Sequence, residues 1–170
     1  GIRGMQPLPA SIAKTTDGGA TWVAQTPLSS TGIIVALDMI DAQNGWYLVY
    51  NGTGAKTTDG GATWTGFNNP SFSPSAFKAF DMSTAVMAGT NAAGRGAVAR
   101  TTNGGVTWDT LAVPRFPYSM TWFAMDWADR STGMLAGSSG MTAFTTDGGT
   151  TWKEEFCGGS ITARSIQMVN

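Results

Sequence analysis

The chain has few charged residues, no histidine and a single cysteine. Lys, Arg, Asp and Glu make up 12% of its 170 residues, and the formal net charge is −1. The ten basic residues are scattered, which argues against a nucleic-acid-binding surface or a polybasic membrane anchor. Without histidine there is no Ser-His-Asp triad and no histidine-ligated zinc. Cys157 alone can form neither an internal disulfide nor a cysteine metal cluster, so we expect no metal and no cofactor.

Long apolar runs are also missing. The longest wholly aliphatic run covers residues 33–37, far short of the roughly 20 residues that a membrane-spanning helix needs. No signal peptide is recognisable, and the chain starts at Gly1 rather than Met, which indicates a processed product or a fragment. The 23 glycines, with abundant Ser and Thr, favour short strands joined by tight turns over helices.

One octapeptide, Thr-Thr-Asp/Asn-Gly-Gly-x-Thr-Trp, occurs four times. Its copies begin at Thr15, Thr57, Thr101 and Thr145, so they are 42, 44 and 44 residues apart. A period near 43 residues is typical of propeller blades. Each copy follows apolar runs and turns that read as short antiparallel strands, four to a repeat. The sequence therefore predicts an all-β propeller of four blades.

The residues that recur in the octapeptide suit a tight hairpin. Gly supplies backbone positions with positive φ, the Asp or Asn side-chain oxygen accepts backbone N–H bonds, and Trp offers a large apolar body that packs between blades. A catalytic group is needed once per site, whereas a turn is needed once per blade. We therefore assign a structural role to the recurring residues Asp17, Gly19, Trp22, Asp59, Gly61, Trp64, Asn103, Gly105, Trp108, Asp147, Gly149 and Trp152.

The two ends of the chain read as parts of one blade. Residues 165–170 align with residues 36–41, a first strand, and Gly4 and Met5 align with the start of a second strand at Gly133 and Met134. We expect a single domain whose N-terminal blade is completed by the C-terminal strand, which removes open sheet edges. The expected repeats are residues 1–26 with 161–170, 31–68, 75–112 and 119–156. Two alternatives remain open: two chains that exchange this strand in an eight-bladed ring, or a piece of a longer array.

The octapeptide resembles the Asp-box, or bacterial neuraminidase repeat, whose pattern is Ser/Thr-x-Asp-x-Gly-x-Thr-Trp; Asn103 departs from it. The longer frame LDMIDAQNGWYLVYNGTGAKTTDGGATW resembles the photosystem II assembly-factor-like propellers and related secreted bacterial proteins. This resemblance spans nearly the whole chain and implies a propeller. It says little about function, because Asp-boxes occur in sialidases, sorting receptors, glycoside hydrolases and non-enzymatic adaptors.

The acidic residues offer little for catalysis. Sialidase chemistry, as the resemblance implies, needs three arginines, a Tyr–Glu pair and an Asp, and the only glutamates here are the adjacent Glu154 and Glu155. A glycoside hydrolase needs a carboxylate pair across a cleft. The aspartates instead recur between repeats, Asp38, Asp81 and Asp126 at one expected strand position and Asp41 and Asp129 in the following turn. We predict that the chain is not an enzyme.

Loops on the face opposite the octapeptide turns are the expected place for recognition. Aromatic residues and Arg are enriched at protein interfaces, which makes these residues the candidate contacts: Phe67, Phe72, Arg95, Arg115, Phe116 and Tyr118. The alternative for the three phenylalanines is that they pack back over the blades.

The expected function is a non-catalytic scaffold or protein-binding module. Its expected setting is extracellular, periplasmic or at the cell surface, or within a larger assembly such as a photosynthetic complex or a surface filament. The alternative is a carbohydrate-active protein, either lectin-like or a fragment similar to a sialidase or glycoside hydrolase. The expected partner is another protein or further copies of the chain, with a glycan as the second choice.

Overall fold

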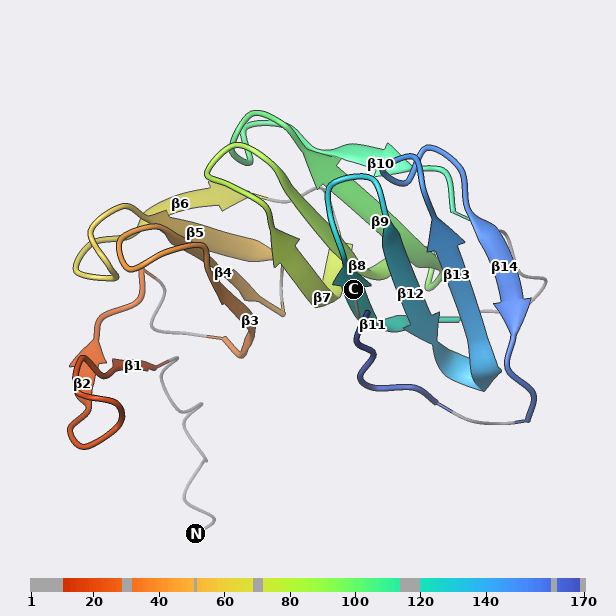
Figure 1. The fold of residues 1–170 in the computed structure, drawn as a ribbon. Helices are drawn as coiled ribbons and strands as arrows, with labels where there is room; N and C mark the ends of the chain where they lie inside the picture. The colour runs from red at the N-terminus through yellow and green to blue at the C-terminus, as the bar shows by residue number, and fades with distance from the viewer. Residues whose placement is uncertain are drawn as a thin grey trace, which may run out of the picture.

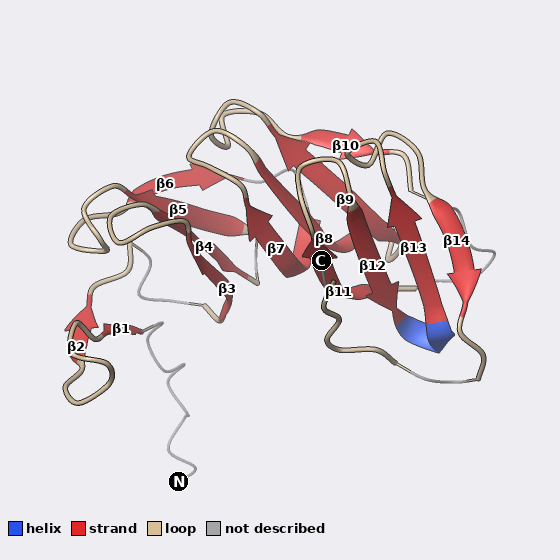
Figure 2. Cartoon of the chain, in the orientation of Figure 1, coloured by secondary structure: helices blue, strands red, loops and turns tan. Residues whose placement is uncertain are grey.

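The computed structural model describes residues 11–28, 32–50, 52–68, 72–113, 120–159 and 162–168. The described part is built from antiparallel strands joined by tight turns (Figures 1 and 2), with a single 3-10 turn, η1 (Ser138–Gly140). No helix among the described residues is long and apolar enough to cross a membrane. The predicted all-β propeller fold is confirmed.

Three complete four-stranded sheets follow an N-terminal hairpin. The hairpin pairs β1 (Ile12–Lys14) with β2 (Val23–Gln25). Each complete sheet is a meander whose strands pair in chain order. The strands are β3 (Ile34–Met39), β4 (Gly45–Val49), β5 (Thr53–Thr57) and β6 (Thr65–Asn68); β7 (Phe72–Ala79), β8 (Ala85–Asn91), β9 (Gly96–Thr101) and β10 (Asp109–Leu111); and β11 (Trp122–Trp127), β12 (Gly133–Gly137), β13 (Met141–Thr145) and β14 (Lys153–Phe156).

The core lies between successive sheets, as in a stack of propeller blades. Every residue of β4 is buried, because both faces of this second strand are covered. Trp46 on β4 is fully buried, and its ring centroid lies 5.2 Å from that of Phe67 and 5.9 Å from that of Phe77, on the next sheet. Trp122 is also fully buried, in the cluster between the second and third complete sheets. The large aromatic residues thus hold neighbouring blades together.

The same kind of hydrogen bond occurs at three junctions between neighbouring blades. The Nζ of Lys14 donates to the carbonyl oxygen of Gly60 at 2.9 Å, and the Nζ of Lys56 donates to that of Gly104 at 2.6 Å. An Arg100 Nη1 donates to the carbonyl of Gly148 at 3.0 Å. Each cation lies three residues before the Asp or Asn of its own octapeptide and reaches the octapeptide of the following sheet. The last sheet has Phe144 at this position, which has no hydrogen-bond donor in its side chain.

The turn between the first and second strands of each complete sheet also repeats. One oxygen of Asp41 accepts the backbone N–H groups of the residues two and three further on, and Asp81 and Asp129 do the same. Asp81 therefore belongs with the turn residues. The sequence-based prediction that Asp81 shares a strand position with Asp38 and Asp126 is wrong.

The cause is a longer hairpin in the second complete sheet. Gly45 pairs with Thr57 across β4 and β5, a separation of 12 residues, whereas Ala85 pairs with Thr101 across β8 and β9, a separation of 16. An alignment of the repeats that is anchored at the octapeptide is therefore displaced by four residues for every position before this hairpin, Asp81 included. The strand position that corresponds to Asp38 is held by Lys78, whose Nζ lies 3.6 Å from Asp38 Oδ2.

The ends of the described chain do not meet. The hairpin β1–β2 is a sheet of two strands, and residues 162–168 form no strand. Figure 1 shows the hairpin at one end of an open arc, while the described C-terminal residues pass beside β11. The backbone N–H of Met168 donates to Asp126 Oδ2 at 2.6 Å. Among the described residues, the expected completion of the N-terminal blade by the C-terminal strand is therefore not formed, because residues 162–168 lie beside β11 of the last sheet and form no strand with β1 or β2.

Candidate functional site

Each of the four octapeptide turns contains the same pattern of hydrogen bonds. In the second copy, the N–H of Gly61 donates to Thr57 Oγ1 at 2.8 Å, and the hydroxyl of Thr57 donates to Asp59 Oδ1 at 2.8 Å. The backbone N–H and the hydroxyl of Thr63 both donate to the Asp59 carboxylate, at 2.8 and 2.6 Å. Gly60 and Gly61 have φ of 70° and 92°, a region that side chains other than Gly rarely adopt. The first and fourth copies have the same bonds.

The third copy keeps the network with an amide. Asn103 Oδ1 accepts the backbone N–H of Thr107 at 3.0 Å, and Asn103 Nδ2 donates to Thr107 Oγ1 at 2.8 Å. The hydroxyl of Thr107 changes from donor to acceptor, so the geometry survives without a charge. The turn therefore needs a side-chain oxygen at this position rather than a carboxylate.

The octapeptide carboxylates are held in their charged form. The Thr63 hydroxyl, followed by the Thr63 backbone N–H, lowers the pKa of Asp59 to about 2, from an ordinary 3.8. The corresponding Thr21 and Thr151 hydroxyls lower the pKa of Asp17 and of Asp147 to about 2 in the same way. A general acid needs a raised pKa, so this environment opposes an acid role for these groups.

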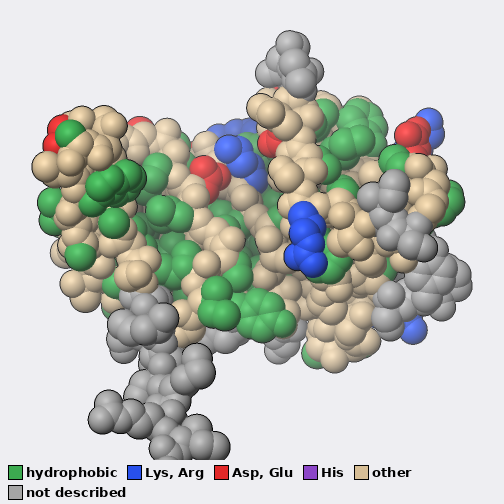
Figure 3. Space-filling model, turned by 90° about the horizontal axis from the view of Figure 1, so that it is seen from below, with side chains coloured by type: hydrophobic (Ala, Val, Ile, Leu, Met, Phe, Trp, Pro, Cys, Tyr) green, Lys and Arg blue, Asp and Glu red, His purple; other side chains and the backbone are tan. Residues whose placement is uncertain are grey.

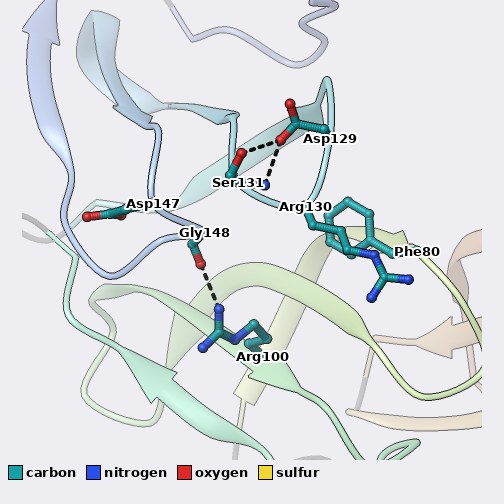
Figure 4. Close-up of a pocket in the computed structure, with 7 residues that line it drawn as sticks. All are labelled: Phe80, Arg100, Asp129, Arg130, Ser131, Asp147 and Gly148. Carbon is teal, nitrogen blue, oxygen red and sulfur yellow. Dashed lines mark hydrogen bonds between the residues drawn. The ribbon is translucent and has the colours of Figure 1, made fainter.

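A groove lies on the octapeptide side of the junction between the second and third complete sheets (Figure 4). Its volume is about 670 Å³. Three parts of the chain line it: the octapeptide turn of the third sheet, the turn after β11 and residues of the second sheet. The lining residues are Phe80, Arg100, Asp129, Arg130, Ser131, Asp147 and Gly148.

Two guanidinium groups give the groove its donors. Arg100 reaches across the junction to the carbonyl of Gly148, as Figure 4 shows. Its Nε is buried and has no hydrogen-bond partner among the described residues. The side chain of Arg130 is 60% exposed and is hydrogen-bonded and ion-paired with Asp81. The groove thus presents arginine N–H groups suited to carboxylate or carbonyl oxygens.

The two carboxylates that line the groove accept hydrogen bonds from residues of their own turns. Asp129 Oδ1 accepts both the backbone N–H and the hydroxyl of Ser131, each at 2.6 Å, and the hydroxyl bond is the main cause of its lowered pKa. Asp147 is bound within its octapeptide. Both groups act as acceptors with lowered pKa, so the pair does not have the contrast of one raised and one ordinary pKa that glycoside hydrolysis requires. Among the described residues, no cluster of three or more Cys, Asp or Glu could hold a metal ion.

The predicted partner contacts fall into three groups. Phe67 and Phe72 lie on β6 and β7 and are buried, 9% and 8% exposed, in the core between the first two complete sheets. Their burial corrects the expectation of exposed loop contacts and matches the packing alternative. Arg95 is exposed in the β8–β9 hairpin and stays a candidate. The other candidates, Arg115, Phe116 and Tyr118, lie outside the described residues.

The groove itself escaped the sequence-based prediction, which placed recognition on the opposite face. The prediction did not include Phe80, Arg130 or Ser131, and at the positions of Phe80 and Arg130 the residue type changes from one repeat to the next. A usable signal was present in the position of Arg100, which replaces the lysines at the other two junctions. What the sequence could not reveal is that the turn containing Arg130 lies beside this junction.

The stacked four-stranded meanders define a β-propeller. No family model and no curated protein sequence matches the chain. Among solved structures, it is similar to YCF48 from Cyanidioschyzon merolae, with 18% identity and a TM-score of 0.68 over 92% of this chain and 53% of that one.

Two further structures share the fold. One is YCF48 bound to D1 peptide, with 21% identity and a TM-score of 0.57 over 71% of this chain and 38% of that one. The other is an ancestral GH74 enzyme, with 19% identity and a TM-score of 0.61 over 82% of this chain and 20% of that one. The chain thus spans about half or less of each of these proteins. The likeness supports the resemblance to photosystem II assembly-factor-like propellers at the level of the fold.

Proposed function

We propose that the chain is a non-catalytic, protein-binding propeller module, and that the groove between its second and third complete sheets takes a peptide segment of a partner. The observation that carries this proposal is the pair Arg100 and Arg130 in one groove, with the buried Nε of Arg100 lacking a partner among the described residues. Burying an N–H without an acceptor costs free energy, which a peptide carbonyl or carboxylate oxygen would relieve. The neighbouring Phe80 offers an apolar surface for the peptide side chains.

The comparison with YCF48 bound to D1 peptide supports this choice of ligand class, since a propeller of similar fold holds a peptide. The likeness to the GH74 enzyme concerns the fold, and the lowered pKa of Asp129 and Asp147 gives the groove no general acid. The sparse charge and the richness in Gly support an extracellular, periplasmic or cell-surface setting, or a place as a subunit of a larger assembly such as a photosynthetic complex or a surface filament.

Selection of binders from a random peptide library, followed by calorimetry with the purified chain, tests the proposal. We expect a binder whose Kd rises about 10- to 100-fold in Arg130→Ala, because a charge-assisted hydrogen bond contributes about 1.5–3 kcal/mol. Lys153→Ala removes an exposed cation outside the groove and should leave Kd unchanged. Arg95→Ala tests the opposite face of the propeller. If Arg95→Ala weakens peptide binding and Arg130→Ala does not, the groove is not the binding site. Glycan binding or glycosidase activity without any peptide binding would favour the carbohydrate-active alternative.

A further inference from the structure

The third octapeptide copy contains an Asn-Gly pair, which the other three copies lack. Asn103 stands where the others have Asp, and Gly104 follows it directly. In an Asn-Gly pair the backbone nitrogen of Gly can attack the side-chain amide of Asn, because Gly has no Cβ to block the approach. This reaction is one reason why asparagine is a thermolabile residue. The turn that holds Asn103 is therefore a place where the chain can change covalently.

The reaction at such a pair has two steps. The Gly104 nitrogen bonds to Cγ of Asn103, and Nδ2 leaves as ammonia with the proton of the Gly104 N–H, so that a succinimide ring forms. Water then opens the ring at either of its carbonyl carbons. Breaking the bond between the nitrogen and Cγ gives aspartate, whereas breaking the bond between the nitrogen and the backbone carbonyl carbon gives isoaspartate. Isoaspartate places an additional methylene group in the main chain.

The side-chain amide of Asn103 is fixed by three hydrogen bonds in the folded chain. Its Oδ1 accepts the Thr107 N–H and the Thr101 hydroxyl, each at 3.0 Å. Its Nδ2 donates to Thr107 Oγ1 at 2.8 Å. Attack at Cγ ends the planar geometry of the amide and expels Nδ2. The bonds that hold this side chain therefore oppose the reaction.

The attacking nitrogen is fixed as well. The N–H of Gly104 donates to the carbonyl oxygen of Ser83, in the turn between β7 and β8, at 2.8 Å. The carbonyl oxygen of Gly104 accepts Lys56 Nζ, from the preceding sheet, at 2.6 Å. Gly104 is buried, although Asn103 itself is exposed. The nitrogen can reach Cγ only after its bond to Ser83 breaks, so the turn has to open first.

We infer that Asn103 is a deamidation site under the control of the fold: it keeps its amide while the third octapeptide turn is closed and loses it when the turn opens. The rate in the folded chain is then the rate in the open chain multiplied by the fraction of time that the turn is open. Because opening leaves a buried donor without its partner, the folded rate should be at least about 10-fold lower. This inference goes beyond the proposed function and does not depend on the groove.

The closed turn also distinguishes the two products. Aspartate at position 103 reproduces the second copy, where the carboxylate accepts a Thr backbone N–H and hydroxyl at 2.8 and 2.6 Å. The Thr107 hydroxyl then changes from acceptor to donor, and the bonds gain strength from the charge. Isoaspartate lengthens the main chain next to the Gly104 and Gly105 N–H groups, which donate to Ser83 and Thr101. We expect the turn to close again with aspartate and to stay open with isoaspartate.

Both products add a negative charge, which provides a readout on the folded protein. Charged residues make up 12% of the chain, and Figure 3 shows few charged side chains on the lower face. Ion-exchange chromatography therefore separates deamidated molecules from unmodified ones. Peptide mapping by mass spectrometry then identifies Asn, aspartate or isoaspartate at position 103.

Incubation of the full chain in mildly alkaline buffer, folded in one arm and unfolded in urea in the other, tests the inference. We expect deamidation at Asn103 in urea and a rate at least about 10-fold lower in the folded chain. The Asn-Gly pairs at residues 44–45 and 51–52 serve as references in the urea arm. Thr107→Val removes the acceptor of Nδ2 and should raise the folded rate about 2- to 10-fold. Thr63→Val makes the same change in the second copy and is the matched control.

A second matched pair of variants tests the hold on Gly104. Lys56→Met removes the cation that binds the Gly104 carbonyl and keeps most of the aliphatic side chain, so it should also raise the folded rate. Lys14→Met makes the same change at Gly60 and should leave the rate at Asn103 as in the wild type. Circular dichroism checks that each variant keeps its strands.

Limited proteolysis of the incubated chain tests the products. Molecules with isoaspartate at position 103 should be cut first, and molecules with aspartate should resist as well as the variant Asn103→Asp. Four results would each overturn the inference: no deamidation at Asn103 in urea, equal rates in the folded and unfolded arms, folded variants Thr107→Val and Lys56→Met that both react like the wild type, or equal cleavage of the two products.

Discussion

Replacing Thr57 by Val tests how much one octapeptide turn contributes to stability. Thr57 is 1% exposed, and Val has nearly the same shape without the hydroxyl. The substitution removes the acceptor of the Gly61 N–H, a buried bond of 2.8 Å, and the donor to Asp59 Oδ1. A buried donor left without its partner costs about 1–3 kcal/mol. At about 2–4 °C per kcal/mol for a chain of this length, thermal unfolding should shift down by roughly 2–12 °C.

Two further variants serve as a control and as a comparison for Thr57→Val. Thr58→Val changes the exposed neighbour and should alter the free energy of unfolding by less than about 0.5 kcal/mol. Thr15→Val makes the same chemical change in the first copy, where the Gly19 N–H is only partly buried, so the loss should be smaller than at Thr57. Urea denaturation followed by tryptophan fluorescence measures all three. Equal stability of Thr57→Val and Thr58→Val would show that the Thr57 hydroxyl does not stabilise the turn.

Acid should destabilise the fold through the octapeptide carboxylates. Their folded pKa of about 2 lies below the ordinary 3.8, so their contribution is present above pH 4 and is lost as pH falls toward 2. The triple replacement of Asp17, Asp59 and Asp147 by Asn, the residue of the third copy, should flatten the melting temperature over this range; an unchanged acid dependence would contradict this. Gly89→Ala places a Cβ 2.2 Å from a backbone oxygen and should cost about 1–3 kcal/mol in a thermal melt. At Gly66→Ala the one close contact of the new Cβ is the flexible end of Leu28, at 2.7 Å, so this variant should cost less; the reverse order would contradict the steric argument.

The repeat made the fold predictable from the sequence. The octapeptide spacing gave the number of blades, and Gly and Asp at fixed places gave the hairpins, because these residues determine local backbone geometry. The four extra residues of the β8–β9 hairpin defeated the alignment of Asp81 with Asp38. The spacing of residues along the chain does not show where the extra residues lie, because the two strands on either side of the insertion have similar composition.

The candidate site was less predictable, because it depends on contacts between repeats. Phe67 stands close to the end of β6 and reads as a loop residue, yet it packs between Trp46 and Trp108. Arg130 reads as an isolated surface charge, and only the stacking of the sheets brings it to the groove with Arg100. The position of residues 162–168 beside β11 likewise depends on a contact between distant segments, the bond from the Met168 N–H to Asp126 Oδ2.

Amide hydrogen exchange at the second Gly of the octapeptides tests the central claim, that a repeated side-chain network holds each turn and thereby each blade. The N–H groups of Gly61, Gly105 and Gly149 each donate to a buried threonine hydroxyl, at 2.8, 2.9 and 2.9 Å. We expect all three N–H groups to exchange as slowly as amides in the central strands, and Thr57→Val to speed exchange at Gly61 alone. Exchange at all three glycines as fast as at exposed loop amides would contradict this claim.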